Sequence, residues 1–490
     1  LLMGMGGSSL CPEVLRRTFG ARPGYPELLV LDSTVPSAVL AFERRIDVER
    51  TLFIVASKSG TTTEPQVFYD YFFDKVARVK GDRAGENFVA ITDPDTLLAR
   101  IAEEKKFRRA FLNPSDIGGR YSALSYFGMV PAALAGLDIT AILDRAGRAM
   151  SSCRAASENP GLDLGVALGV LARRGRDKLT FAITPPVDSL GLWIEQLVAE
   201  STGKEGVGIL PVVGEPLADP EVYGNDRVFV YIHTLDSTDK DTETRLAALV
   251  SAGHPVIVRT LDDPNSLGEE FFVWEFATAV AGVVLQINPF DQPNVQESKD
   301  NTRRLLEGYA REGNLPEQEV LAGDNGIRLH ASAEMKTLLA VPALSDQTAP
   351  TAASVIALHL ASVRAGDYVA LTAYIEETVE NDRALEQVRA RIRDRLRVAT
   401  TVGYGPRFLH STGQFHKGGP PTGVFIQITS DDAEEVPIPD RPYTFSTLKQ
   451  AQALGDFQSL AGRSLRAIRF HARRDVSAGL EALLDAVRRR

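Results

Sequence analysis

The sequence predicts an α/β protein built on doubly wound parallel sheets, and two observations carry that prediction. Short apolar runs rich in β-branched residues recur along the chain, and helical stretches separate them. Several of these runs are almost continuously apolar, which is typical of strands buried on both faces of a parallel sheet. Strands that alternate with helices imply right-handed crossovers and helices on both faces of each sheet.

The predicted strands fall into three groups along the chain. They are residues 28–32, 51–57 and 87–92, then 179–183, 228–232, 255–259 and 283–287, and then 368–375, 424–429 and 467–471. The pattern restarts after a helix near 143–153, so we expect two tandem α/β domains, residues 1–150 and residues 151–320. Residues 321–490 either form a third α/β unit or add strands to the second sheet, and the sequence leaves both options open. A helix rich in Asp, Arg and Glu is expected at 379–397, with its charges on a solvated face.

Composition excludes several classes of protein. The chain has 490 residues, of which 44% are hydrophobic and 24% charged, enough for two or three domain cores. Its net charge of −10 argues against an extended nucleic-acid surface. No apolar run reaches the roughly 20 residues that cross a bilayer, and Cys11 and Cys153 alone make no disulfide framework. We expect a cytoplasmic protein with neither a membrane nor a nucleic acid as partner.

The segment 57–65, SKSGTTTEP, is the most informative motif because it connects a buried strand to a helix. Its hydroxyl groups, its free backbone N–H groups and the positive end of the helix dipole would meet in one small space. The segment lacks the pattern of a Walker A loop, so a nucleoside triphosphatase is not indicated. It predicts a phosphate-binding loop.

A second strand-to-helix turn, GMGGSS at residues 4–9, partly imitates a dinucleotide-binding fingerprint. Ser9 occupies the third glycine position, which argues against NAD or FAD. We expect a backbone contact to a small ligand instead.

Together, these two segments resemble the sugar isomerase domain of phosphoglucose isomerases. Three more segments match that family in the same order: IGGRYSALSYFG at 117–128, IEQLVAESTGK at 194–204 and NPFDQPNVQESK at 288–299. The agreement extends over roughly 300 residues. The tail 404–429, together with 31–36, is similar to the isomerase half of transaldolase and phosphoglucose isomerase fusion proteins.

The resemblance implies a glucose-6-phosphate isomerase that works through an enediolate, with no cofactor and no metal. It implies that Glu200 moves the proton between C2 and C1, that Arg120 stabilises the enediolate, and that Lys299 assists ring opening. The implied contacts to the hexose 6-phosphate are Gly7, Ser8, Ser57, Lys58 through its backbone, Ser59, Thr61, Thr62, Gly119, Gln196 and Gln292.

Helical spacing adds an expectation about four of these residues. Gln196 lies one helical turn before Glu200, so both side chains project from the same side. Gln292 and Lys299 are seven residues apart and would share a helix face if the helix starts near Pro293.

The histidine that acts on the ring oxygen is harder to assign. In the family it comes between the glutamate and the lysine in an NGQH-like segment, but His233 and His254 in that interval lack such a setting. The nearest likeness is TGQFH at 412–416, which follows the lysine. His416 is the first candidate and His410 the second, and either requires the third unit to fold back onto the site.

The sequence is compatible with three functions and with two kinds of partner. The chain is a glucose-6-phosphate isomerase, an isomerase that also accepts mannose 6-phosphate, or a non-catalytic sugar-phosphate-binding regulatory module. The presence of the glutamate, arginine and lysine favours an enzyme. Family members are commonly dimers, so a homodimer is an expectation, and a transaldolase domain preceding Leu1 is another.

Overall fold

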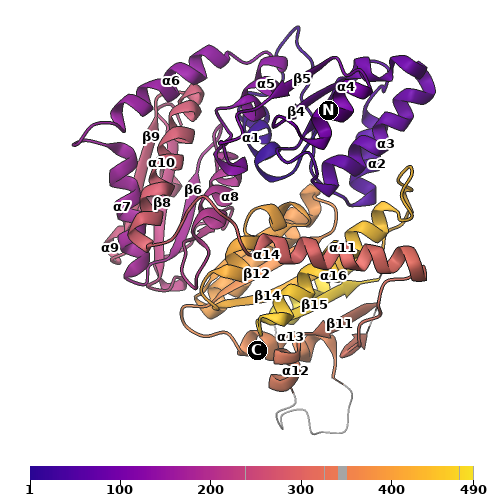
Figure 1. Ribbon diagram of the computed structural model, residues 1–490. Coiled ribbons are helices and arrows are strands. Elements are labelled where there is room, and N and C mark those ends of the chain that lie inside the picture. The colour runs from indigo at the N-terminus through magenta and orange to yellow at the C-terminus, as the bar shows by residue number, and fades with distance from the viewer. Residues whose placement is uncertain (238, 325, 340–349, 474, 489–490) are drawn as a thin grey trace.

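The computed structural model describes residues 1–237, 239–324, 326–339, 350–473 and 475–488. In these ranges the strands form three sheets with helices packed around them (Figure 1). The predicted α/β class with parallel sheets is confirmed. None of the helices in the described ranges is both long and apolar enough to cross a membrane.

The first sheet is parallel throughout and has the strand order β2-β1-β3-β4-β5. The chain leaves β1 for one edge and returns to the other side of β1, so the strand order reverses between β1 and β3. Ligands bind parallel sheets at such a switch point, outside the carboxyl ends of the strands. The elements are β1 (Leu2–Met3), η1 (Gly6–Ser8), α1 (Leu10–Phe19), β2 (Val30–Leu31), α2 (Pro36–Arg45), β3 (Phe53–Ala56), α3 (Thr63–Lys80), η2 (Gly81–Asn87), β4 (Phe88–Thr92), α4 (Leu97–Glu104), β5 (Arg109–Leu112), η3 (Gly119–Tyr121) and α5 (Tyr126–Leu134).

The second sheet is also parallel, with the order β7-β6-β8-β9. Its elements are α6 (Ile139–Ser152), α7 (Pro160–Arg173), β6 (Lys178–Ile183), α8 (Leu190–Thr202), β7 (Leu210–Val212), η4 (Pro220–Val222), β8 (Arg227–Thr234), α9 (Lys240–Ser251), β9 (Val256–Leu261), η5 (Pro264–Ser266) and α10 (Leu267–Leu285). The strand predicted at 283–287 is wrong, because these residues include the end of α10. Helix α10 packs against α6, α7 and α8, so it is apolar around most of its surface and lacks the periodicity that marks a helix.

The third sheet is separate from the second and has the order β10-β11-β15-β14-β12-β13, so the strands after residue 320 form a third unit. Strands β12 to β15 are parallel, and β11 pairs antiparallel with both β15 and β10. The elements are α11 (Val295–Glu312), β10 (Ala322–Asp324), β11 (Ile327–Ala331), α12 (Ala333–Leu339), α13 (Ala352–Ala361), β12 (Tyr368–Tyr374), α14 (Val379–Leu396), β13 (Ala399–Tyr404), η7 (Arg407–His410), α15 (Gly413–Gly418), β14 (Gly423–Ser430), α16 (Phe445–Gly462), β15 (Arg466–Ala472) and α17 (Val476–Arg488).

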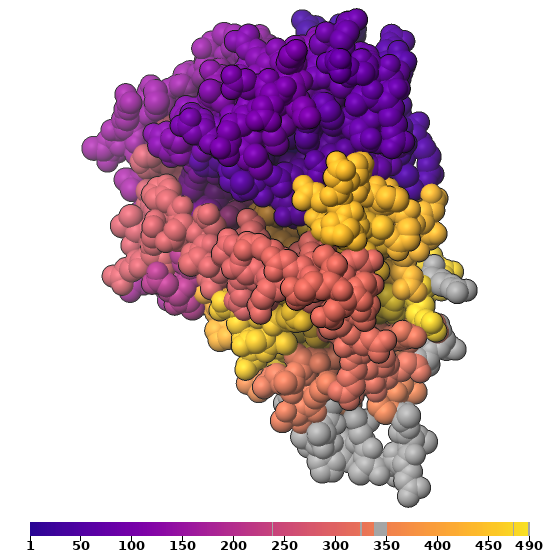
Figure 2. Space-filling view, turned by 45° about the vertical axis from the view of Figure 1, so that its right-hand side comes forward, coloured from indigo at the N-terminus to yellow at the C-terminus, as the bar shows by residue number. Residues whose placement is uncertain are grey.

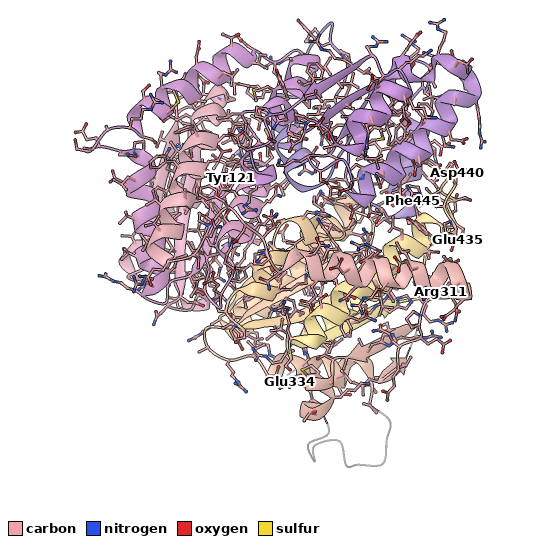
Figure 3. All side chains as sticks on the ribbon, in the orientation of Figure 1. Tyr121, Arg311, Glu334, Glu435, Asp440 and Phe445 are labelled. Atoms are coloured by element: carbon pink, nitrogen blue, oxygen red, sulfur yellow. The ribbon has the colours of Figure 1, made fainter. Side chains whose placement is uncertain are left out.

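Hydrophobic clusters cross the borders between the three units. One joins α1 and α5 of the first unit to α8 and α10 of the second. Another joins α3 of the first unit to α11 and α16 of the third, where Phe445 stacks on Phe68 with ring centroids 6.1 Å apart. Figure 3 labels Phe445 at the border between the N-terminal and C-terminal parts of the chain. In the space-filling view the C-terminal atoms in yellow lie against the N-terminal atoms in indigo (Figure 2). Since the units share these cores, domain boundaries near residues 150 and 320 remain our proposal. Helix α11 precedes residue 320 but packs on α16, so it is described with the third unit.

Candidate active site

The predicted phosphate loop follows β3 at the switch point of the first sheet and leads into α3. Gly60 has φ of +64°, and a Cβ there would lie 2.7 Å from the Cβ of Thr96, so the turn requires glycine. Ser57 donates a hydrogen bond to Thr62 Oγ1 at 3.2 Å, and the first turn of α3 has no side-chain cap. Its N–H groups are therefore available to an anion.

The other hydroxyl groups of the loop are open to solvent, while its lysine points away. Ser59 and Thr61 are exposed and Thr62 is half-buried. The Lys58 ammonium pairs with Asp93 and donates to the Ser115 carbonyl at 3.0 Å. Only the backbone of Lys58 remains for a ligand at this loop, as the resemblance implies.

One cavity of about 590 Å³ joins the phosphate loop to two further predicted residues. Its lining includes Ser59, Thr61 and Thr62 from the loop, Lys299 from α11 and His410 from η7. These residues come from the first and third units, far apart in the sequence. The third unit therefore does fold back onto the first, as the histidine assignment required.

A second cluster holds the predicted base and the predicted arginine side by side. Arg120 Nη1 lies 3.3 Å from Glu200 Oε1, and both side chains are largely buried, 4% and 11% exposed. Gln196 donates to Glu200 Oε2 at 3.0 Å, which is the predicted one-turn contact on α8. This arrangement places a fixed positive charge beside a carboxylate.

The guanidinium of Arg120 is held on several sides. Its Nε donates to Ser201 Oγ at 2.7 Å, its Nη2 donates to the Pro289 carbonyl at 2.7 Å, and its Nη1 donates to Gln292 Oε1 at 3.0 Å. Gln292 lies in the loop before α11, which begins at Val295, so Gln292 and Lys299 do not share a helix face. Gln292 instead reaches the site through Arg120.

Three short turns bring the two clusters together. The would-be Cβ of Gly7 lies 2.0 Å from the Gly119 carbonyl oxygen, and that of Gly6 lies 2.9 Å from Gln196 Nε2 and 3.0 Å from His410 Cβ. Turns η1, η3 and η7 can pack this closely only because η1 starts with two glycines. Ser8, the third residue of η1, is buried.

His410 links the two clusters. Its carbonyl accepts a hydrogen bond from Gln196 Nε2 at 2.8 Å, and its ring Nε2 lies 3.3 Å from Glu64 Oε1. A continuous path of contacts therefore runs from Glu200 through Gln196 and His410 to Glu64, which lies in the first turn of α3.

His416 occupies a different environment, inside the third unit. Its ring stacks on Tyr368, and its Nδ1 lies 2.8 Å from the Tyr368 hydroxyl. Burial lowers the pKa of His416 to about 3, so the ring is neutral at physiological pH. It packs between Tyr368, Phe408 and Phe425. Of the two candidate histidines, His410 is the one that lines the cavity with Lys299.

Glu64 and Gln452 are site residues that sequence reasoning missed. Burial would raise the pKa of Glu64, but the neighbouring His410 and Lys299 outweigh burial and lower it. Gln452 donates to Glu64 Oε1 at 2.7 Å and accepts from the Thr34 hydroxyl at 2.7 Å. Glu64 lies inside the SKSGTTTEP motif, but an acidic residue in the first turn of a helix ordinarily interacts only with the helix dipole. Gln452 lies in no motif that would have indicated a role at the site.

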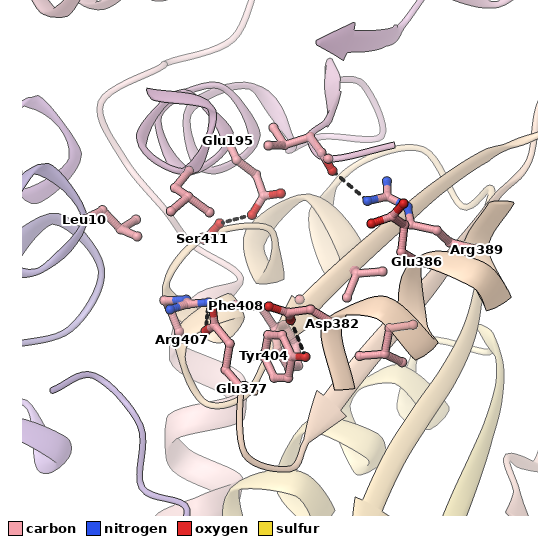
Figure 4. A pocket seen from close by; sticks show the side chains of 16 residues that line it. Leu10, Glu195, Glu377, Asp382, Glu386, Arg389, Tyr404, Arg407, Phe408 and Ser411 are labelled. Atoms are coloured by element: carbon pink, nitrogen blue, oxygen red, sulfur yellow. Dashed lines mark hydrogen bonds and ion pairs between the residues drawn. The ribbon is translucent and has the colours of Figure 1, made fainter. Parts of the chain in front are cut away.

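A second, smaller cavity of about 250 Å³ lies between α8, α14 and η7, on the other side of the His410 turn (Figure 4). Glu195 faces it and accepts a hydrogen bond from Ser411 Oγ at 3.1 Å. Burial raises the pKa of Glu195 to about 7. Glu195 and Ser411 are the chain neighbours of Gln196 and His410, so the two cavities share one wall.

Comparisons with known proteins identify relatives of this chain by sequence. The family model described as phosphoglucose isomerase matches residues 1–208. The glucose-6-phosphate isomerase of Heliobacterium modesticaldum is 31% identical over 62% of this chain and 80% of that protein. That of Thermus thermophilus is 30% identical over 63% of this chain and 83% of that protein.

A solved structure, that of a hypothetical protein from Thermus thermophilus, aligns with a TM-score of 0.57 and 26% identity over 62% of this chain and 82% of that one. The two chains therefore share a fold over that part of their length. The chain belongs to the phosphoglucose isomerase family and is an aldose–ketose isomerase.

Proposed function

We propose that this protein is a glucose-6-phosphate isomerase that interconverts glucose 6-phosphate and fructose 6-phosphate. The observation that carries the proposal is the path of contacts from the phosphate loop to Glu200. Glu64 follows the loop, His410 contacts Glu64, and Gln196 contacts both His410 and Glu200. This path supports binding of the phosphate and chemistry at C1 and C2 within one substrate.

In this proposal the first step is binding and ring opening. The hydroxyl groups of Ser57, Ser59 and Thr62 and the N–H groups of α3 bind the phosphate dianion. His410 and Lys299 line the same cavity, so they would transfer the proton of the O1 hydroxyl to the ring oxygen as the ring C–O bond breaks. The ionised carboxylate of Glu64 orients the His410 ring.

The second step is proton transfer along the open chain. The Glu200 carboxylate takes the proton from C2, and the electron pair of that C–H bond forms the C1–C2 double bond of an enediolate. Glu200 then returns the proton to C1, while the proton of the O2 hydroxyl passes to O1. The Arg120 guanidinium, 3.3 Å from Glu200, stabilises the negative charge between the two transfers.

The test is a coupled assay of fructose 6-phosphate conversion with Glu200→Gln. We expect kcat to fall by about 10²- to 10⁴-fold, because a general base is lost, while phosphate binding stays nearly unchanged. Glu205→Gln, an exposed residue on the turn after α8, is the matched control and should retain wild-type activity. An unchanged rate in Glu200→Gln would overturn the mechanism.

All of these groups lie in one copy of the chain. The phosphate loop comes from the first unit, Glu200 from the second, and Lys299 and His410 from the third. We therefore propose that a single chain is catalytically complete, whether or not it forms a homodimer. A preceding transaldolase domain and a cytoplasmic location stay predictions.

A further inference from the structure

One face of the third sheet, the basic face, carries arginine and histidine side chains where three strands meet. In β15, Arg469 and His471 point to the same face because alternate residues of a strand share a side. The register sets His330 of β11 opposite Arg469 and Arg328 opposite His471. On the other side of β15, Gln427 and Thr429 of β14 lie opposite the same two residues.

This basic face lines a cavity of about 520 Å³ at the carboxyl ends of β14 and β15, beside α16. The contributing basic residues are Arg328, His330, Lys449, Arg469 and His471. In parallel sheets the carboxyl ends of the strands are where ligands bind. The cavity lies outside the set of residues that line the candidate active site.

Arg469 is the residue whose charge is not balanced. Its Nη1 donates to Gln318 Oε1 at 2.7 Å and its Nε donates to Thr429 Oγ1 at 3.3 Å, both neutral oxygens. No carboxylate of the described residues pairs with it. Burial lowers the pKa of Arg469 to about 10, and only Tyr374 opposes this shift. Arg469 is half-buried, and a partly desolvated guanidinium without an anion lacks the pairing that would offset its desolvation.

The acidic residues near the cavity are already engaged or lie at its exposed rim. Asp431 contacts His471 Nε2 at 3.1 Å, and Asp432 pairs with the Lys449 ammonium at 2.6 Å. Glu317 is exposed. Burial and the neighbouring arginines lower the pKa of His330, so its ring stands opposite Arg469 as a neutral group and adds no negative charge. The group that is missing from this arrangement is an anion.

We propose that this cavity is a second anion site, which binds the phosphate dianion of a small phosphomonoester beside Arg469 and Arg328. The planar guanidinium offers paired donors that match phosphate oxygens. The rest of the cavity has room for the organic group of the ligand. Because these residues lie outside the isomerase machinery, the proposal stands independently of the proposed function.

The experiment titrates the full chain with inorganic phosphate and, separately, with glycerol 3-phosphate by calorimetry. The background is the double variant Ser59→Ala with Thr62→Ala, which weakens the catalytic phosphate loop. In it we expect one remaining site, and we expect Arg469→Gln to weaken that site by about 10- to 100-fold, since a charged hydrogen-bond donor is lost. Tighter binding of glycerol 3-phosphate would identify a phosphomonoester rather than free phosphate as the ligand.

Two controls make the outcome decisive. Arg473→Gln removes an exposed arginine just after β15 and should leave binding unchanged. Arg328→Gln removes a lining residue that is more exposed than Arg469, tests the same site, and should weaken binding by less than tenfold. Wild-type affinity in both Arg469→Gln and Arg328→Gln, or no site left in the background variant, would overturn the proposal.

Discussion

Glu195 shows how burial of a single side chain makes stability depend on pH. Its pKa is raised from the usual 4.5 to about 7. Between these two values the folded state binds more protons than the unfolded state, so this residue lowers stability as pH rises from 4.5 toward 7. Above pH 7 the carboxylate is ionised in both the folded and the unfolded state, so its burial lowers the stability by a constant amount.

Replacing Glu195 with glutamine should therefore stabilise the protein at alkaline pH. The amide keeps an oxygen for the Ser411 hydroxyl and never ionises. We expect Glu195→Gln to gain up to about 3 kcal/mol at pH 8 and nothing at pH 4.5, from the size of the pKa shift. Urea unfolding at both pH values measures this. An equal effect at the two pH values would contradict the assignment.

Some site residues could be predicted from local sequence motifs, while others depend on long-range packing that the sequence does not reveal. Glu200, Gln196 and Arg120 come together as expected, because each lies in a local motif whose geometry is fixed by one helix or one turn. The choice between His410 and His416 depends on which way a short turn faces after long-range packing. The two histidines are close neighbours in the chain, yet one lines a cavity while the other lies in an aromatic core.

At the scale of elements, the close packing of η1 on η3 makes Gly7 critical. A methyl group at Gly7 would lie 2.0 Å from the Gly119 carbonyl oxygen and 3.0 Å from the Arg120 backbone nitrogen. The two turns would have to separate, which moves Arg120 away from Glu200. Overpacking of this kind costs about 1–3 kcal/mol.

We therefore expect Gly7→Ala to lower kcat/KM by at least about tenfold and to lower the melting temperature, because a displaced Arg120 stabilises the enediolate less well. The matched control is Gly147→Ala in α6, where an added Cβ meets nothing within 4 Å. Alanine favours a helix by about 0.5–1 kcal/mol over glycine, so this control should be active and slightly more stable. Full activity of Gly7→Ala would show that the turns can separate without consequence.

The predicted helices and strands are correct where the local hydrophobic pattern matches the burial of the segment in the fold. Strands β3 and β4 are almost continuously apolar, β6 and β8 have apolar central residues, and nearly all residues of the four strands are buried. The end of α10 has the same composition but is enclosed by helices, so no local pattern distinguishes it from a strand. Helix α14 looked solvated, yet its Arg389 and Arg393 are buried and donate to the Val213 and Pro216 carbonyls of the second unit.

At the scale of the whole molecule, the site exists only because three units pack together. The sequence could not decide whether residues 321–490 extend the second sheet, since strand pairing over hundreds of residues leaves no local trace. In the structure this third unit supplies Lys299 and His410, and the shared core of α3, α11 and α16 holds both against the phosphate loop. This packing supports our proposal that a single chain completes its own site.

This arrangement predicts the result of mixing two inactive variants. Glu200→Gln lacks the base and Lys299→Ala lacks a ring-opening group. If sites were completed across a dimer interface, a mixed dimer would contain one intact site and the mixture would regain activity. Because each site draws both residues from one chain, we expect no recovery after unfolding and refolding the two variants together. Wild-type chains refolded with either variant should show only the activity of the wild-type fraction, and partial recovery in the mixture of variants would mean that a neighbouring chain supplies Glu200 or Lys299.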